Sequence, residues 1–168
     1  QVVRQAPPGS VKAVVADLAD PEAACAALAE AARLLGRLDV FWGNAGVVGP
    51  AGIEDLTLAD YANAEAINLR ANVLMAGEAV RLMRAASGGA MLFTSSISGL
   101  VGSRKSPVYA VTKHALLGLT RSLAIAHGTH GIRVNAICPG ITETPMLPHA
   151  MGRGLDTVSY THLTLPTS

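Results

Sequence analysis

Residues 90–113, AMLFTSSISGLVGSRKSPVYAVTK, decide the fold of this chain. The apolar run at residues 90–94 predicts a buried strand, and Ser95-Ser96 follows at its end. A loop is expected up to Ser106-Pro107, because a serine followed by proline is a typical helix start. A strand, a loop and a helix in this order indicate a sheet whose neighbouring strands are joined by helices.

Tyr109 and Lys113 lie four residues apart in the predicted helix. Residues at this spacing share one helix face, so the phenol and the ammonium are expected in the same cleft. A nearby cation lowers the pKa of a phenol, which makes Tyr109 a candidate acid–base group. The same spacing also arises in helices where tyrosine packs and lysine points to water, so the pair alone does not decide the function.

Strands and helices alternate along most of the chain. Predicted strands lie at residues 11–16, 38–42, 90–94 and 132–137, and predicted helices at residues 21–35, 57–86 and 107–127. Continuous apolar strands that alternate with helices predict a parallel sheet covered on both faces. The expected fold class is therefore α/β, with a doubly wound parallel sheet.

Polar residues follow each predicted strand. Asp17, Asn44, Ser96 and the loop at residues 139–144 each come after a different strand. In open parallel sheets, ligands bind beyond the carboxyl ends of the strands. We therefore expect these residues to lie at one edge of the sheet and to form one site.

Composition excludes several classes of function. The chain has 168 residues, 50% of them hydrophobic, 15% charged, and a net charge of +1. This balance predicts one globular domain without a nucleic-acid surface, and no apolar run reaches membrane-spanning length. Cys25 and Cys138 are isolated in sequence, which predicts neither a disulfide framework nor a zinc site and suits the cytoplasm. His127 and His130 are expected near a helix end, and no metal is predicted.

The motifs follow the order of a known family. The chain resembles an ordinary single-domain short-chain dehydrogenase/reductase over residues 11–148. The resemblance implies a Rossmann-type sheet, of which this chain would hold a part. It is carried by Asp17-Leu18, Asn44-Ala45-Gly46, Asn68, Ser95-Ser96 with Gly99, Tyr109-x-x-x-Lys113, Arg133-Val134-Asn135 and Pro139-Gly140-x-x-x-Thr144.

The resemblance implies four catalytic residues. Tyr109 would be the acid–base group, and Lys113 would lower its pKa and hold the nicotinamide ribose. Ser96 would hydrogen-bond the substrate carbonyl or hydroxyl. Asn68 would hold a water that links Lys113 to solvent. The implied activity is an NAD(P)-dependent oxidoreductase that interconverts an alcohol and a carbonyl of a small-molecule substrate.

The resemblance also implies a site for NAD or NADP. Asp17 and Leu18 would contact adenine, and Asn44-Ala45-Gly46 would line the cofactor cleft. Thr144 would hold the nicotinamide carboxamide together with the backbone of Ile141 in the Pro139-Gly140 loop. Dimers or tetramers formed through the two long helices are common in the family.

Each assignment has a simpler alternative. Asp17 could cap a turn, because aspartate is a favoured turn residue, and Ser96 could be an ordinary loop serine. Thr144 lies in a loop already rich in threonine, so its role stays open. Asn68 is a poor helix former inside an apolar helix, and such a misfit favours a functional role.

The sequence departs from the family at both ends. It contains no glycine-rich turn between a first strand and a helix, the element that meets a pyrophosphate. Residues 153–168 match nothing in the family, so we expect an incomplete domain at residues 1–152 and a disordered tail. Trp42 and Gly43 also replace commoner residues. The sequence therefore leaves two hypotheses, the central part of an oxidoreductase and a non-catalytic α/β domain without cofactor binding.

Overall fold

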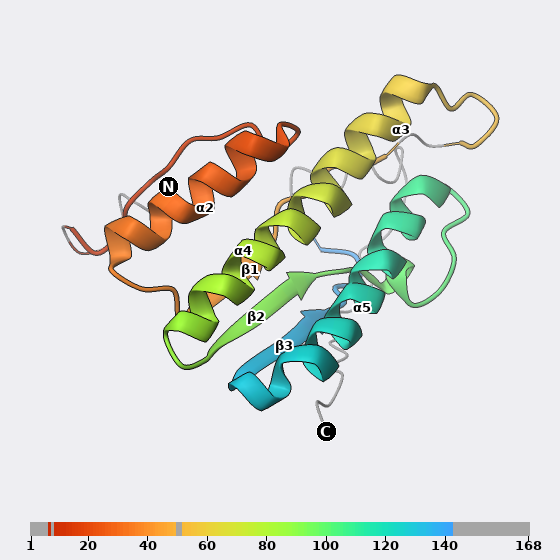
Figure 1. Ribbon diagram of the computed structural model, residues 1–168. Coiled ribbons are helices and arrows are strands. Elements are labelled where there is room, and N and C mark those ends of the chain that lie inside the picture. The colour runs from red at the N-terminus through yellow and green to blue at the C-terminus, as the bar shows by residue number, and fades with distance from the viewer. Residues whose placement is uncertain (1–6, 8, 50–51, 143–168) are drawn as a thin grey trace.

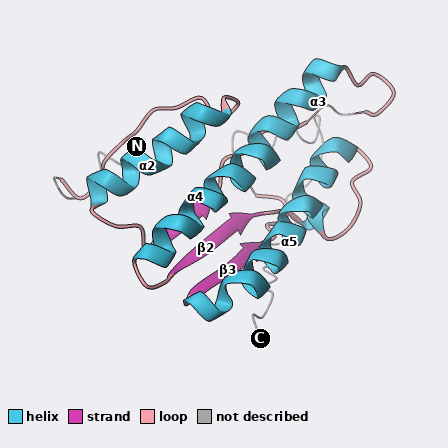
Figure 2. Cartoon of the chain, viewed as in Figure 1, coloured by secondary structure: helices cyan, strands magenta, loops and turns pink. Residues whose placement is uncertain are grey.

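A parallel sheet forms the centre of the structure. The computed structural model describes residue 7, residues 9–49 and residues 52–142. In this part of the chain the sheet has three strands in the order β1-β2-β3, all parallel (Figures 1 and 2). The α/β fold class with a parallel sheet is therefore confirmed. The strands are β1 (Val40–Gly43), β2 (Gly89–Thr94) and β3 (Ile132–Ile137), and the α-helices are α2 (Pro21–Leu35), α3 (Leu58–Glu65), α4 (Ala71–Ala85) and α5 (Pro107–His127).

The helix ends follow the expected signals. Asp20 accepts hydrogen bonds from the backbone N–H groups of Glu22 and Ala23, and Gly36 ends α2 with a φ of 81°. Thr57 caps α3 in the same way. A single π-helical turn, Ala66–Arg70, joins α3 to α4, so the predicted helix at residues 57–86 is nearly continuous. Such turns widen a helix locally and often occur at functional sites.

One face of the sheet carries the core. Phe41, Met91 and Val134 are aligned across the three strands, and each is at most 5% exposed. Phe93 lies two residues after Met91 in β2. Its ring and that of Phe41 pack edge to face, with their centroids 6.0 Å apart. Burial of these side chains against α4 and α5 supplies the main hydrophobic stabilisation of the sheet.

The described helices cover that same face. The chain passes from β1 to β2 and then from β2 to β3, each time to the next strand in the same direction across the parallel sheet. Because both crossovers are right-handed, α4 and α5 lie on the same face. In Figure 1, α2 lies beside α4, and α5 lies in front of β3. On the opposite face Val40 is 63% and Trp42 is 54% exposed. The expected helical cover on both faces is therefore seen on one face only within the described residues.

The predicted strand at residues 11–16 is wrong. This segment is irregular, and Val15 is 98% exposed. An apolar run becomes a strand only when a neighbouring strand supplies hydrogen-bond partners, and none pairs with this segment among the described residues. Strand β1 also begins two residues later than predicted.

Two further findings concern the described helices and cysteines. None of these helices combines the length and apolarity needed to cross a membrane. Cys25 and Cys138 are both free thiols.

Candidate active site

The segments after β2 and β3 meet at the carboxyl edge of the sheet. Ser95, directly after β2, donates its backbone N–H to the carbonyl of Ile137 at 2.8 Å. Ile97 donates to the carbonyl of Pro139 at 3.0 Å. The loops after β2 and β3 are thereby tied together, which gives the edge a fixed shape.

Ser96 and Tyr109 come together at this edge. Ser96 is only 8% exposed, and its hydroxyl lies near enough to Tyr109 to act on the pKa of the phenol. Its Oγ also accepts the backbone N–H of Ser98 at 3.1 Å, which fixes the start of the short turn Ile97–Gly99. Both hydroxyls can therefore reach one substrate oxygen.

Lys113 lies beside Tyr109 and is almost fully buried. Its Nζ is 5.4 Å from the centre of the Tyr109 ring and donates to the Thr94 carbonyl at 2.7 Å. The side chain of Ser95 donates to the Lys113 carbonyl at 2.8 Å. The end of β2 therefore holds this turn of α5 through both its backbone and its side chain.

The pKa of Tyr109 differs from the expectation. Burial raises the pKa of the Tyr109 phenol, and the hydrogen bond with Ser96 opposes this rise without cancelling it. Burial also lowers the pKa of Lys113 from 10.5 to about 8. The expected lowering of the Tyr109 pKa by Lys113 is wrong for this structure, because burial of the phenol has the larger effect and raises its pKa.

Asn68 connects the turn after β1 to α5. It is fully buried in the π-helical turn, and its side-chain amide pairs with the backbone of Val47. Val47 N–H donates to Asn68 Oδ1 at 2.7 Å, and Asn68 Nδ2 donates to the Val47 carbonyl at 2.9 Å. Asn68 Nδ2 also lies 3.3 Å from the hydroxyl of Thr112. The structure thus brings Asn68 to the same edge as Lys113.

The Asn44-Ala45-Gly46 turn borders the same group of side chains. Asn44 is exposed, and its Oδ1 accepts the hydroxyl of Thr94 at 2.8 Å. A Cβ on Gly46 would lie 3.2 Å from Asn68 Oδ1 and 3.4 Å from Lys113 Nζ. Glycine at this position therefore keeps the space beside the lysine open.

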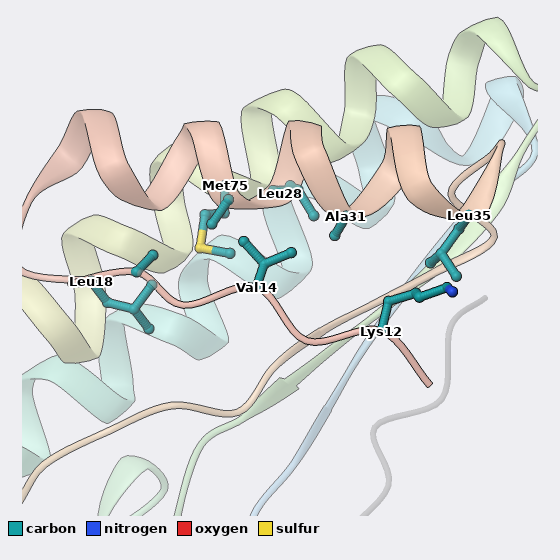
Figure 3. A pocket seen from close by; sticks show the side chains of 9 residues that line it. Lys12, Val14, Leu18, Leu28, Ala31, Leu35 and Met75 are labelled. Atoms are coloured by element: carbon teal, nitrogen blue, oxygen red, sulfur yellow. The ribbon is translucent and has the colours of Figure 1, made fainter. Parts of the chain in front are cut away.

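Asp17 and Leu18 lie apart from these residues. The Asp17 side chain accepts the backbone N–H of Ala19 at 2.9 Å, which is the turn-capping alternative. Figure 3 shows Leu18 in an apolar groove between residues 12–18 and α2, with Leu28 and Met75 also in its wall. Neither Tyr109 nor Lys113 lines this groove. The adenine contacts of Asp17 and Leu18 stay a prediction.

The loop after β3 is described only in part. Pro139, Gly140 and Ile141 are half-buried beside the loop that follows β2. Thr144 lies outside the described residues. Their contacts with a nicotinamide stay a prediction.

Sequence reasoning missed Thr94 and Thr112. Thr94 is the last residue of β2, and it contacts Lys113 through its carbonyl and Asn44 through its hydroxyl. Thr112 lies between Tyr109 and Lys113, is 2% exposed, and meets Asn68. A polar residue at a strand end or on a buried helix face is the signal that could have revealed both.

No group of three or more metal-ligating side chains occurs among the described residues. The His127 and His130 rings lie 5.8 Å apart at the end of α5. Within the described residues, His127 Nδ1 is a buried nitrogen without a hydrogen-bond partner.

Comparisons with known proteins agree with the fold. Residues 1–161 match a family model described as enoyl-(acyl carrier protein) reductase. Levodione reductase of Leifsonia aquatica is 36% identical over 151 residues, which cover 89% of this chain and 57% of that protein. A cis-4-hydroxycyclohexanecarboxylate dehydrogenase of Sinomonas cyclohexanicum is 38% identical over 132 residues, which cover 78% of this chain and 53% of that protein.

Solved structures give the same result. The crystal structure of levodione reductase superposes with a TM-score of 0.83 at 36% identity, over 89% of this chain and 58% of the other. A Beutenbergia cavernae protein, assigned as an NAD(P)-dependent gluconate 5-dehydrogenase and solved with bound NADP at low occupancy, superposes with a TM-score of 0.79. That match is 35% identical and covers 84% of this chain and 57% of the other.

The chain spans about half the length of these relatives. The family model covers nearly the whole chain, and the predicted motifs occur in the family's order. This chain therefore belongs to the short-chain dehydrogenase/reductase family.

Proposed function

We propose that this chain supplies the proton-transfer centre of an oxidoreductase that interconverts an alcohol and a carbonyl with NAD or NADP. Because the chain spans about half the length of its relatives, the activity is proposed for the whole protein. The observation that carries the proposal is the position of the Tyr109 ring, 5.4 Å from the buried ammonium of Lys113 and beside Ser96.

Tyr109 is the proposed proton donor in the reduction. A raised pKa keeps its phenol protonated at neutral pH, so the proton is available for the carbonyl oxygen of the substrate. Ser96 donates a hydrogen bond to the same oxygen. The Lys113 ammonium, 5.4 Å from the ring centre, stabilises the phenolate that remains. In the oxidation the same groups act in reverse.

Asn68 holds this centre together in the proposal. Its amide pairs with Val47, and its Nδ2 meets the hydroxyl of Thr112 on α5. The turn after β1 is thereby fixed relative to Tyr109 and Lys113. This arrangement supports a role for Asn68 in guiding protons from solvent to Lys113.

The residues present fit the nicotinamide-ribose half of a dinucleotide. A buried ammonium and the hydroxyls of Ser96 and Tyr109 supply donors that a ribose and a carboxamide require, and Gly46 leaves space beside the ammonium. Tyr109 and Lys113 would hold the ribose, and residues 44–46 would line the cleft. The cofactor would carry the hydride that is added to or removed from the substrate carbon. The relative solved with NADP supports a nicotinamide cofactor without deciding between NAD and NADP.

The first substrates to test are small cyclic alcohols and ketones. The relatives named for levodione and for cis-4-hydroxycyclohexanecarboxylate are more than a third identical to this chain. These two compounds are therefore the starting panel, with turnover followed through the absorbance of NADH or NADPH.

The test of the proposal is Tyr109→Phe in the whole protein. Phenylalanine keeps the ring and removes only the hydroxyl, so kcat should fall by about 10²–10⁴-fold, whereas cofactor affinity, which Lys113 still supports, should change much less. Tyr61→Phe on α3 is the matched control, because Tyr61 is 43% exposed. Near-normal kcat in Tyr109→Phe would refute the proton-transfer role of Tyr109, whereas the non-catalytic alternative would be favoured by a wild-type protein that shows no turnover.

We further propose a homo-oligomer in the cytoplasm. Apolar side chains remain exposed on the two long helices, with Val73 on α4 at 41% and Val111 and Ile125 on α5 at 61% and 84%. Pairing of these helices between two copies would cover them. The free thiols of Cys25 and Cys138 suit a reducing compartment. Light scattering of the whole protein would give the mass of a dimer or tetramer, and a monomer would contradict the proposal.

A further inference from the structure

The position of Asn68 depends on a second asparagine one turn further along. Asn72 lies in the first turn of α4 and is only 5% exposed. Its Nδ2 donates to the backbone carbonyl of Asn68 at 3.0 Å. This bond reaches back into the π-helical turn Ala66–Arg70, where the regular helical pattern is interrupted. Asn72 therefore holds the backbone of Asn68, and the side chain of Asn68 in turn holds Val47.

Gly43 provides the space that Asn72 occupies. Gly43 is the last residue of β1, and a Cβ added to it would overlap Asn72 Oδ1. The same Cβ would lie 2.9 Å from Cδ1 of Phe93, which is fully buried. A side chain at residue 43 and the present position of Asn72 are therefore incompatible in a core packed at normal density. The amide of Asn72 fills the place that a larger residue 43 would take.

The effect continues to the turn after β1. Only residues 44–46 separate Gly43 from Val47, and Asn68 binds the Val47 backbone on both sides, at 2.7 Å and 2.9 Å. Any shift of Asn72 moves the Asn68 carbonyl, and with it the amide that fixes this turn. Displacements of about 1 Å at a catalytic centre can lower rates by about 10²-fold.

We propose that Asn72 is a positioning residue for Asn68, and that Gly43 and Asn72 form one paired unit. Its link to catalysis rests on the proposed function, whereas its link to the Val47 backbone does not. Asn72 acts through Asn68 and touches neither Tyr109 nor Lys113 through any of its hydrogen bonds in the described residues.

The experiment measures amide hydrogen exchange and kcat in the whole protein. Asn72→Ala removes the donor to the Asn68 carbonyl, so exchange of the Val47 amide should accelerate by about 10-fold or more. Exchange of the Phe93 amide in β2 should stay unchanged, because a general loss of stability would accelerate exchange of both the Phe93 and the Val47 amides. The value of kcat should fall by about 10–100-fold. Asn63→Ala is the matched control, because Asn63 is exposed on the preceding helix α3.

The paired unit is tested by combining substitutions. Gly43→Ala should displace Asn72 and accelerate Val47 exchange as Asn72→Ala does. In Gly43→Ala/Asn72→Ala the new methyl group enters the vacated space, so Val47 exchange should be no faster than in Asn72→Ala alone. The proposal would be overturned if Asn72→Ala left the rate of Val47 exchange unchanged. It would also be overturned if the accelerations of Val47 exchange in the two single variants multiplied in the double variant. If Val47 exchange became faster while kcat stayed normal, Asn72 would still be shown to position the backbone, but the role of Asn68 in the reaction would be refuted.

Discussion

The buried ammonium of Lys113 is the feature at the residue scale with the clearest consequence for stability. The side chain is 3% exposed, and burial lowers its pKa to about 8. Below that pH the folded protein must keep a charged group out of water, whereas the unfolded chain does not. Lys113 therefore makes the free energy of unfolding depend on pH.

We predict the sign of this dependence. Between about pH 8 and the ordinary value of 10.5, the unfolded state binds more protons at Lys113 than the folded state. The contribution of Lys113 to the free energy of unfolding should thus rise with pH across this window, by at most on the order of 3 kcal/mol. Tyr109 acts in the opposite direction above its ordinary value of 10.0, because its pKa is raised.

The measurement compares urea unfolding of the wild type and Lys113→Met from pH 7 to pH 10. Tyr109 keeps its proton over most of this pH range, because its pKa is raised above 10.0, so the difference between the two proteins reports on Lys113. The stability of Lys113→Met relative to the wild type should fall as the pH rises. Lys12→Met, whose side chain is exposed, is the matched control. A constant difference between Lys113→Met and the wild type would contradict the lowered pKa of Lys113.

Ser96 carries the second prediction at this scale. Ser96→Ala removes the proposed donor to the substrate oxygen, so kcat should fall by about 10²–10³-fold. The substitution also removes the acceptor for Ser98 N–H, which should cost about 1 kcal/mol of stability. Ser96→Thr should recover part of kcat, because threonine keeps the hydroxyl. Ser98→Ala is the control at a neighbouring residue. An equal fall of kcat in Ser96→Ala and Ser98→Ala would show that the substitutions only disturb the loop.

At the scale of elements, the loop after β2 fits tightly against α5. A Cβ on Gly99 would overlap the Ser95 hydroxyl and lie 2.8 Å from the carbonyl oxygen of Lys113. The Ser95 hydroxyl already donates to that same carbonyl at 2.8 Å. Gly99 therefore allows the end of β2 and the turn of α5 that carries Lys113 to approach each other.

We predict that Gly99→Ala lowers the free energy of unfolding by about 1–3 kcal/mol, because overpacking forces the loop and helix apart. Chemical denaturation would give the value. A methyl group on Gly102, three residues further along, would meet no heavy atom within 4 Å. Gly102→Ala should consequently change stability little, and equal effects of the two substitutions would refute the close fit.

At the scale of the whole molecule, the sheet is open in two ways. Within the described residues β1 pairs only with β2, so its other edge has free backbone groups. The sheet face away from α4 and α5 exposes Val40 and Trp42. Unpaired strand edges and exposed apolar side chains both promote association.

We therefore expect the 168-residue chain by itself to aggregate and to bind dinucleotides weakly. Its sequence contains no glycine-rich turn before a helix, the element that meets a pyrophosphate. Light scattering and a titration followed by NADH or NADPH fluorescence would measure both properties. Val40→Lys should reduce aggregation, since a charge on the exposed edge strand opposes pairing. A soluble wild-type monomer with saturable micromolar binding would contradict the prediction.

Elements that depend on local physical chemistry could be predicted from single segments of the chain. Helix α5 and strand β3 lie where their start signals and apolar runs predicted them. Ser96, Tyr109 and Lys113 come together at the carboxyl edge as expected, whereas Asp17 lies apart from them. Spacing along a helix and position at a strand end fix the direction of a side chain before any tertiary contact forms.

The tertiary structure alone decided what depends on neighbours distant in sequence. Residues 11–16 have the composition of a strand, yet they have no pairing partner among the described residues. The pKa of Tyr109 rises because burial of the phenol, which no local pattern reveals, outweighs its hydrogen bond with Ser96. Gly43 and Asn72 are 29 positions apart in the sequence, and only folding brings the glycine against the amide. Pairing, desolvation and packing each require a second segment of chain, so the sequence pattern of one segment cannot determine them.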